Sequence, residues 1–308
     1  MINWAIYMQI SVAIPTYKRP DDINKCVVSV VGQTLPPAEV LVIDDDILPA
    51  ELIDDLRQKV EAIGARFVYY RKNHSHDPRG LSFSRHIALK QATHDVLIID
   101  DDIVLAEDCL AWLAQAKQEE SESGLIGIGG LIRNNRRQNL LERFFNYIFG
   151  LTSFLAWDVN ASGFQVWNDF ISARQRGYYA HGGFCLYNRT AALSVGFPPF
   201  QGGRPGLEDV YFSLRAKQLG FHYILEPRAG CWHYHSSGGR DSQYRSGFQE
   251  SQNRKVIFRD LCESGLIGRI RFYRANKGWI LRQFLAGHFF KGLGMLSGFL
   301  CRINNINS

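Results

Sequence analysis

One pattern occurs twice in this chain, as Val40-Leu41-Val42-Ile43-Asp44-Asp45-Asp46 and as Val96-Leu97-Ile98-Ile99-Asp100-Asp101-Asp102. Each apolar run is short and rich in β-branched residues, which is typical of a buried parallel strand. In open α/β sheets, ligands bind just beyond the carboxyl ends of such strands. Carboxylates clustered there repel one another unless a cation offsets their charge, and a hard divalent metal that carries a phosphate group would do so. The pattern therefore predicts a nucleotide and metal site.

Strands and helices alternate through the first 120 residues. We expect strands at 9–14, 40–43, 66–70 and 96–99, the first of them ended by Pro15, and helices at 81–91 and 106–120. Two further helices are expected to begin at Asp21, as an N-cap, and after Pro49. This order predicts an α/β fold with a mainly parallel central sheet flanked by helices.

The pattern changes after Gly124, although no linker or low-complexity segment separates the two halves. We expect a glycine-rich strand at 125–132, an apolar aromatic stretch at 140–157, a helix at 208–219 and a strand at 221–225. Residues 1–130 are predicted to form a nucleotide-binding half and residues 131–236 an acceptor half on one continuous sheet. A helical region is predicted at 237–308.

Composition limits the class of protein. The 308 residues are 46% hydrophobic and 21% charged, which is ordinary for a globular protein. Six cysteines are scattered without a CxxC pair, and no secretory signal opens the sequence. We therefore expect buried thiols in a cytoplasmic protein.

Residues 254–302 carry much of the positive charge, with ten lysines and arginines against two acids. Large apolar residues lie among them from 279 to 300, but Arg282 and Lys291 interrupt this set, so no bilayer-spanning helix is expected. Two interpretations stay open. The region contacts the inner face of an anionic membrane peripherally, or its helices cover the domain or form a dimer contact. The region shows no recognisable nucleic-acid motif.

A longer set of motifs runs in order through residues 9–236. Its segments are Ser11-Val12-Ala13-Ile14-Pro15-Thr16-Tyr17-Lys18-Arg19, Gln33-Thr34, Asp44-Asp45-Asp46, Gly80-Leu81-Ser82-Phe83-Ser84-Arg85, Asp100-Asp101-Asp102, Gly182-Gly183-Phe184, Gly196-Phe197, Glu208-Asp209 and His233. This ordered set resembles the family 2 glycosyltransferases, which are inverting enzymes with the GT-A fold, whereas a DxD-type motif alone is a weak signal. Two positions depart from the family pattern, since His86 stands where Asn is common and Asp46 where Gly is common.

The resemblance implies a site for a nucleotide-diphosphate sugar and for Mn²⁺ or Mg²⁺. Asp102 would bind the metal, with His233 as a second ligand and His235 as the alternative histidine. Such a metal stabilises the departing diphosphate as a Lewis acid. Without the resemblance, an acid cluster of this kind reads equally well as a solvated turn or a helix cap.

The resemblance also assigns residues to the donor. Asp45 would accept a hydrogen bond from the base or ribose, Asp100 would help to hold the same groups, and Arg85 would contact the base or a phosphate. The alternative for Arg85 is an ordinary helix-surface cation. The full set of donor-binding residues implied is Pro15, Thr16, Tyr17, Arg19, Asp45, Arg85, Asp100, Asp101 and Gly183.

Asp209 is the catalytic base that the resemblance implies, with Glu208 as its alternate. Inversion requires in-line attack by an acceptor hydroxyl, and a carboxylate on the opposite face of the sugar can take its proton. The competing interpretation is that both acids only stabilise the start of a helix.

The function implied is that of an inverting, metal-dependent glycosyltransferase. It would use a UDP- or dTDP-sugar to extend a glycan or lipid-linked glycan in cell-surface polysaccharide synthesis. A sugar-nucleotide nucleotidyltransferase is the alternative, although Pro15-Thr16-Tyr17 stands where that class has a glycine-rich phosphate loop. A non-catalytic glycan-binding relative is the third hypothesis, which the intact Asp102, Asp209 and His233 disfavour.

Overall fold

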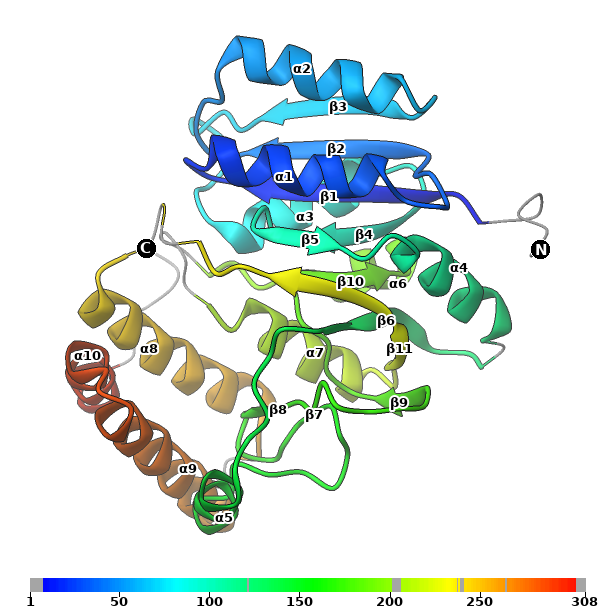
Figure 1. The fold of residues 1–308 in the computed structure, drawn as a ribbon. Coiled ribbons are helices and arrows are strands. Elements are labelled where there is room, and N and C mark those ends of the chain that lie inside the picture. Colours follow the sequence, from blue (N-terminus) through cyan, green and yellow to red (C-terminus); the bar gives the residue numbers. More distant parts are fainter. Residues whose placement is uncertain are drawn as a thin grey trace.

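A nine-stranded mixed sheet forms the centre of the structure (Figure 1). The computed structural model describes residues 8–120, 122–200, 206–236, 238, 241–263 and 265–302. The strands lie in the order β3-β2-β1-β4-β10-β6-β11-β5, and β9 pairs with β11. One sheet therefore runs through both halves of the chain, as predicted.

The parallel part of the sheet consists of strands that alternate with helices. β1 pairs in parallel with β2 and β4, and β2 pairs in parallel with β3. Because both faces of these strands are covered by helices, their sequences are almost continuously apolar. The elements are β1 (Ile10–Thr16), α1 (Pro20–Val31), β2 (Glu39–Asp44), α2 (Ala50–Glu61), β3 (Arg66–Arg71), α3 (Leu81–Gln91) and β4 (Asp95–Ile99).

Two predictions about the first strand and helix were wrong. β1 continues through Pro15 to Thr16. The pairing of β1 with β4 ends at Ala13, so the missing N–H of Pro15 lies on a side where the ladder has already stopped. Asp21 is not the N-cap of α1, because Arg19 takes that position and Pro20 opens the helix with its preset φ.

Beyond β4 the sheet is mixed, because β11 and β6 pair in parallel while the other strand pairs are antiparallel. β10 (Phe184–Tyr187) lies between β4 and β6 (Leu125–Ile132), and β11 (His222–His233) pairs with β6, β5 (Ile103–Leu105) and β9 (Gln175–Gly177). The sequence analysis missed β5, which has three residues and depends on β11 for pairing. The remaining elements of this half are α4 (Cys109–Glu119), α5 (Leu140–Ile148), the pair β7 (Asp158–Val159) and β8 (Gln165–Val166), α6 (Arg189–Val195) and α7 (Glu208–Gln218).

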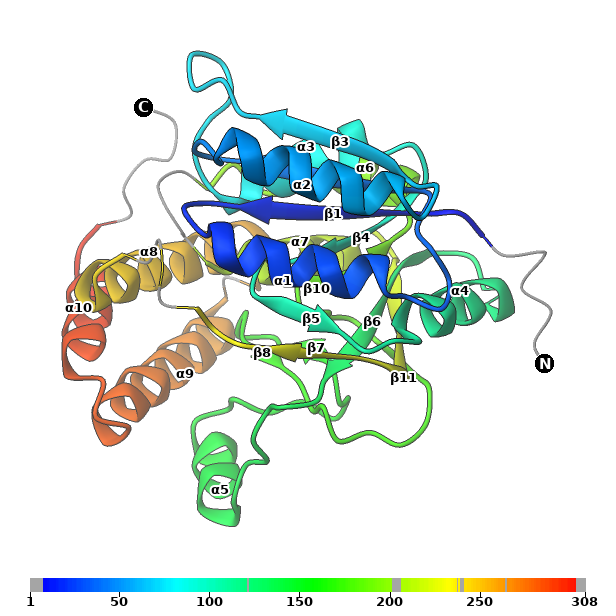
Figure 2. The same ribbon diagram turned by 45° about the horizontal axis from the view of Figure 1, so that its top comes forward.

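Three helices follow the sheet: α8 (Gln243–Leu261), α9 (Leu266–Leu285) and α10 (Phe289–Leu300). They lie on the side toward which β1 and β11 run (Figures 1 and 2). α8 and α10 pack closely, since a Cβ at Gly294 would collide with the backbone of Tyr244. The buried carboxylate of Glu250 on α8 pairs with Arg254 and Lys291 and accepts a hydrogen bond from the indole of Trp279. Val256 and Ile257 of α8 also lie in one core cluster with Val210 and Leu214 of α7, so part of the region covers the domain.

α5 and α9 keep large apolar side chains at the surface. On α5, Leu140 and Leu141 are each 79% exposed. Phe149, just after α5, packs on α9, where a Cβ at Gly278 would meet its ring. Within the described residues, every helix is too short or too polar to span a bilayer. The other exposed apolar residues of these helices are Phe144, Tyr147, Ile148, Leu266, Ile267, Ile270, Tyr273, Leu281 and Leu285.

The cysteines confirm the expectation of buried thiols only in part. Cys26, Cys109, Cys185 and Cys231 are buried and free. Cys262 is half-buried, and the free thiol Cys301 is exposed just beyond the end of α10. A residue at the end of a surface helix has few neighbours, so the Cys301 side chain is exposed although the sequence analysis expected a buried thiol.

Candidate active site

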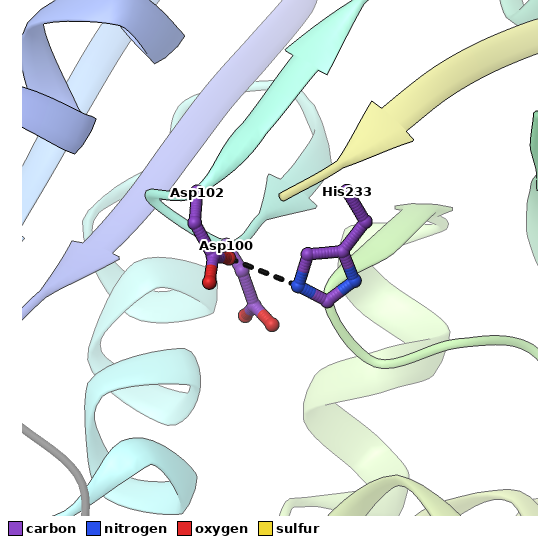
Figure 3. Close-up of side chains that lie close together, drawn as sticks. All are labelled: Asp100, Asp102 and His233. Carbon is purple, nitrogen blue, oxygen red and sulfur yellow. Dashed lines mark ion pairs between the residues drawn. The ribbon is translucent and has the colours of Figure 1, made fainter. Parts of the chain in front are cut away.

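The three aspartates of the second motif form the turn between β4 and β5. β11 ends beside this turn, because His233 is the register partner of Ile103. The ring of His233 therefore reaches Asp102, with Nε2 3.0 Å from Oδ1 (Figure 3). One ligand atom from each of Asp100, Asp102 and His233 lies within 4.8 Å of the others. Strand pairing thus brings residues 131 positions apart in the chain to one point.

This group of side chains fits a hard divalent cation. Carboxylate oxygens suit Mg²⁺ and Mn²⁺, and a neutral imidazole is a common additional ligand for Mn²⁺. The side chain of Asp102 is fully buried, while those of Asp100 and His233 are 14% and 17% exposed. A bound cation would therefore have a buried ligand behind it and an open side toward solvent.

Arg19 and Thr16 brace the aspartates from the end of β1. Arg19 Nη1 lies 2.9 Å from Asp101 Oδ1 and 3.1 Å from Asp102 Oδ2, and Thr16 Oγ1 donates to Asp101 Oδ2 at 2.8 Å. Burial raises the pKa of Asp101 to about 6, even though Arg19 and Thr16 favour the charged form. The buried face of the turn is thus held by one cation and one hydroxyl.

A buried ion-pair network joins the turn to the start of α7. Arg85 of α3 donates to Asp100 Oδ1 at 3.0 Å and also pairs with Glu208. Burial disfavours the charged guanidinium, but Glu208 and Asp100 outweigh it and raise the pKa of Arg85 above its usual value. Burial also raises the pKa of Glu208, which Arg85 offsets in part. Arg85 is therefore a buried residue rather than a helix-surface cation.

Asp209 lies next to Glu208 but has different neighbours. Tyr179 Oη donates to Asp209 Oδ2 at 2.9 Å, and the backbone N–H of Gly182 donates to the same oxygen at 3.3 Å. The side chain is half-buried and lines a cleft, whereas that of Glu208 is buried against Arg85.

Gly182 and Gly183 are required by close approach of side chains. A Cβ at Gly183 would overlap the carboxylate of Asp100, and one at Gly182 would collide with Arg85 and Asp209. Both glycines thus let the acids and Arg85 lie against the backbone before β10.

Two clefts meet at this turn. A central cleft of about 640 Å³ is lined by Asp100, His233 and Asp209 together, as well as by Arg85, Gly183 and Glu208. A smaller pocket of about 290 Å³ is lined by Asp45, by Asp100 and Asp101, and by the run from Pro15 to Arg19. Asp102 lies behind both, in contact with His233 and Arg19. The structure therefore brings every residue of the predicted site to one region.

Residues 11–192 match the family described as glycosyl transferase family 2. The chain belongs to this family. A curated relative, the poly(ribitol-phosphate) beta-glucosyltransferase of Bacillus spizizenii, is 27% identical over 128 residues, which are 40% of this chain and 20% of that protein. The chain thus spans about a fifth of the length of that curated relative.

Solved structures of glycosyltransferases share the fold. GalNAc-T7 with UDP, GalNAc and Mn²⁺ has a TM-score of 0.60 at 18% identity, over 83% of this chain and 48% of that one. The mannosyltransferase PcManGT of Pyrobaculum calidifontis with GDP-Man and Mn²⁺ has a TM-score of 0.57 at 16% identity, over 97% and 86%. S. aureus TarS 1–349 has a TM-score of 0.55 at 16% identity, over 95% and 80%. This family member therefore has the GT-A fold.

Sequence reasoning missed Lys72, Arg79 and Asp241. Lys72 holds Asp45 together with Gly80 of the quoted motif, since Lys72 Nζ lies 2.9 Å from Oδ1 and the Gly80 N–H donates to Oδ2 at 2.8 Å. Burial lowers the pKa of Lys72, although Asp45 opposes this shift. Arg79 and Asp241 also line the smaller pocket. No local pattern marks these residues, because only the tertiary fold brings them to Asp45.

Two tryptophans near the site differ in their surroundings. Trp157 is fully buried and stacks on Tyr179, so it packs in the core. Trp167 lines a third cleft, and its ring lies 5.5 Å from that of His181. His235 lies with its ring centroid 3.9 Å from that of His233 and also lines the central cleft.

Proposed function

We propose that this chain is an inverting, metal-dependent glycosyltransferase. It would move a sugar from a nucleotide-diphosphate donor, UDP- or dTDP-linked, to a glycan or lipid-linked glycan in cell-surface polysaccharide synthesis. The observation that carries the proposal is the meeting of Asp100, His233 and Asp209 on one cleft beside a nucleotide-sized pocket. Relatives solved with UDP or GDP-Man and Mn²⁺ support a nucleotide-sugar donor.

The pocket at the ends of β1 and β2 is proposed to hold the nucleotide. Asp45 is fixed by Lys72 and Gly80, so that its carboxylate is oriented to accept from the base or ribose. Arg85 and Gly183 line the central cleft next to Asp100, where the diphosphate and the sugar would lie. The other proposed donor residues of this pocket are Pro15, Thr16, Tyr17, Arg19, Asp100 and Asp101.

Asp102 and His233 are proposed to hold Mn²⁺ or Mg²⁺, with Asp100 at the same point. When bound, the cation offsets the negative charge that develops on the departing diphosphate. Arg19 keeps the carboxylate of Asp102 in place through Oδ2, which leaves Oδ1 directed at His233.

Asp209 is proposed as the general base rather than Glu208. Glu208 borders the same cleft, but its side chain is buried and its carboxylate is engaged by the Arg85 guanidinium. Asp209 borders the cleft, and the donors Tyr179 and Gly182 hold its Oδ2 in a fixed orientation. The acceptor oxygen would attack the anomeric carbon in line with the leaving diphosphate and transfer its proton to Asp209.

We also propose that α5 and α9 contact the inner face of an anionic membrane. The face of α9 at the surface combines apolar residues with Arg269, Arg271, Arg274 and Lys277, and α9 contains no acid. A helix with this composition binds in the plane of an anionic bilayer surface. Such contact would suit an acceptor carried on a lipid.

Nucleotide release from a panel of UDP-, dTDP- and GDP-sugars tests the enzymatic proposal. We expect nucleoside diphosphate to appear with Mn²⁺ or Mg²⁺ and an acceptor glycan, and the rate to fall about 10²–10³-fold in Asp102→Asn. Pyrophosphate as the product would instead favour a nucleotidyltransferase. Absence of metal-dependent nucleotide binding by calorimetry would favour a non-catalytic relative.

A further inference from the structure

A third cleft, the largest of the three described here, lies between α5, the segment from 151 to 170, and α9. Its volume is about 980 Å³, at the upper end of the range for small-molecule sites. It shares Gln165, Gln283 and His288 with the central cleft, so the two are continuous. A chain-like ligand in this cleft could extend to Asp209.

The cleft has an excess of positively charged side chains. Arg137, Arg143 and Arg282 line it, and within the described residues none of them forms an ion pair. Arg137 lies over the ring of Phe170, and Arg282 donates to the amide oxygen of Asn146 at 3.5 Å.

The two acids of the cleft are already engaged. Glu142 pairs with Arg136 and closes the capping box of α5 with Asn139. Asp169 is buried, accepts a hydrogen bond from Asn135 and lies 3.8 Å from His181. Within the described residues, neither carboxylate therefore forms an ion pair with Arg137, Arg143 or Arg282.

Aromatic rings lie among these arginines. Tyr147, Trp167, Phe170 and Trp279 line the same cleft, and Trp279 also lies beneath the guanidinium of Arg282 at 5.4 Å. Flat apolar faces suit sugar or polyol carbons, while guanidinium groups form paired hydrogen bonds with phosphate or carboxylate oxygens. The combination fits a polymer that alternates carbon-rich units with anionic groups.

We propose that this cleft binds the acceptor as a polyanionic glycan chain, with repeating phosphodiester or carboxylate groups held by Arg137, Arg143 and Arg282. The acceptor role rests on the proposed function, whereas binding of the polymer does not. The end of the chain would lie near Gln165 and His288, where the cleft joins the one that Asp209 borders.

Binding of defined polymers to the full chain tests this proposal. The probes are a poly(glycerol phosphate), a polygalacturonate and a neutral dextran of similar length, with calorimetry at low and high salt. We expect one or both anionic polymers to bind more tightly than dextran, and the tighter of the two identifies the anionic group. Replacing all three arginines by glutamine should weaken that binding about tenfold or more. Arg271→Gln on α9, outside the cleft, should leave it unchanged.

The proposal would be overturned if dextran bound as tightly as the anionic polymers, or if the triple variant bound them like the unaltered protein. It would also be overturned if a single-stranded oligonucleotide bound as tightly as the anionic glycans. Salt dependence in the unaltered protein gives a second measurement should the triple variant unfold, because a salt-insensitive affinity excludes arginine pairing. Metal-dependent nucleotide binding is measured on the same samples. If metal-dependent nucleotide binding were absent while polymer binding was intact, the proposed function would be rejected and the proposal on polymer binding would stand.

Discussion

Glu208 and Asp209 show how one backbone step separates two roles for the same kind of side chain. At the start of α7, successive residues point in directions about 100° apart, so Glu208 contacts Arg85 while Asp209 contacts Tyr179 and Gly182. The donors Tyr179 and Gly182 then set the orientation of Asp209.

Asp209→Asn should lower kcat about 10²–10⁴-fold, since an amide cannot take the acceptor proton. Nucleotide affinity should stay unchanged, because the contacts of Asp209 lie away from the pocket of Asp45. Steady-state kinetics and calorimetry measure the two quantities. Tyr179→Phe, which removes one hydrogen bond to Asp209 but keeps the carboxylate, should retain most of the activity. Near-normal turnover in Asp209→Asn would reject its assignment as the base.

Gly183→Ala should weaken Mn²⁺ binding about tenfold or more, because the added methyl would displace the carboxylate of Asp100. Electron paramagnetic resonance of free Mn²⁺ measures this. Gly265→Ala is the matched control, since a Cβ there meets no atom within 4 Å. If both variants bound Mn²⁺ like the unaltered protein, Asp100 would have no part in the metal site.

At the scale of elements, Glu39 ties three strands together at the start of β2. Its buried carboxylate accepts from Ser11 of β1, from Arg66 of β3 and from Thr93 before β4. Burial alone would raise its pKa, but these donors outweigh burial and lower the pKa of Glu39 below its ordinary value.

Glu39→Gln should reduce the free energy of unfolding by about 1–3 kcal/mol at pH 7, because buried donors lose a charged acceptor. A lowered folded-state pKa means that the stabilisation is present above the unfolded-state pKa of about 4.3 and is lost as pH falls through the folded-state value. The difference between variant and unaltered protein should therefore shrink below about pH 4. Urea unfolding across pH 3–7 measures it, and a constant difference would contradict the assignment.

Long periodic segments were predictable from sequence, and elements that depend on distant partners were not. The helix at 81–91 and the strand at 125–132 have the predicted bounds. β5 and the course of β1 beyond Pro15 depend on where neighbouring strands stop, which no local pattern states. In the site, the aspartates were predictable, whereas Lys72 and Asp241 reach it only through tertiary packing.

For the molecule as a whole, we predict from the exposed surface of α5 and α9 that the protein binds to anionic membranes. The protein should sediment with phosphatidylglycerol vesicles but not with phosphatidylcholine vesicles, and high salt should weaken this binding. Leu141→Glu combined with Phe144→Glu should abolish it, because the two charges replace exposed apolar side chains of α5.

Leu219→Glu is the control for this pair, since Leu219 is also exposed but follows α7 and belongs to neither α5 nor α9. Sedimentation equilibrium supplies the alternative outcome. If the unaltered protein is a dimer that Leu141→Glu and Phe144→Glu dissociate, the face is a contact between protein copies.

β11 carries an irregularity between Leu225 and Gly230, where its register with β6 shifts before the strand continues to β5 and His233. At residues 226–229 a gained or lost residue can be absorbed in the bulge, so that it need not displace the proposed metal ligands. Between Gly230 and His233 the same single-residue change would turn the histidine to the opposite face of the sheet. Descendants of this chain should therefore accept length changes at 226–229 and reject them in the four residues that follow.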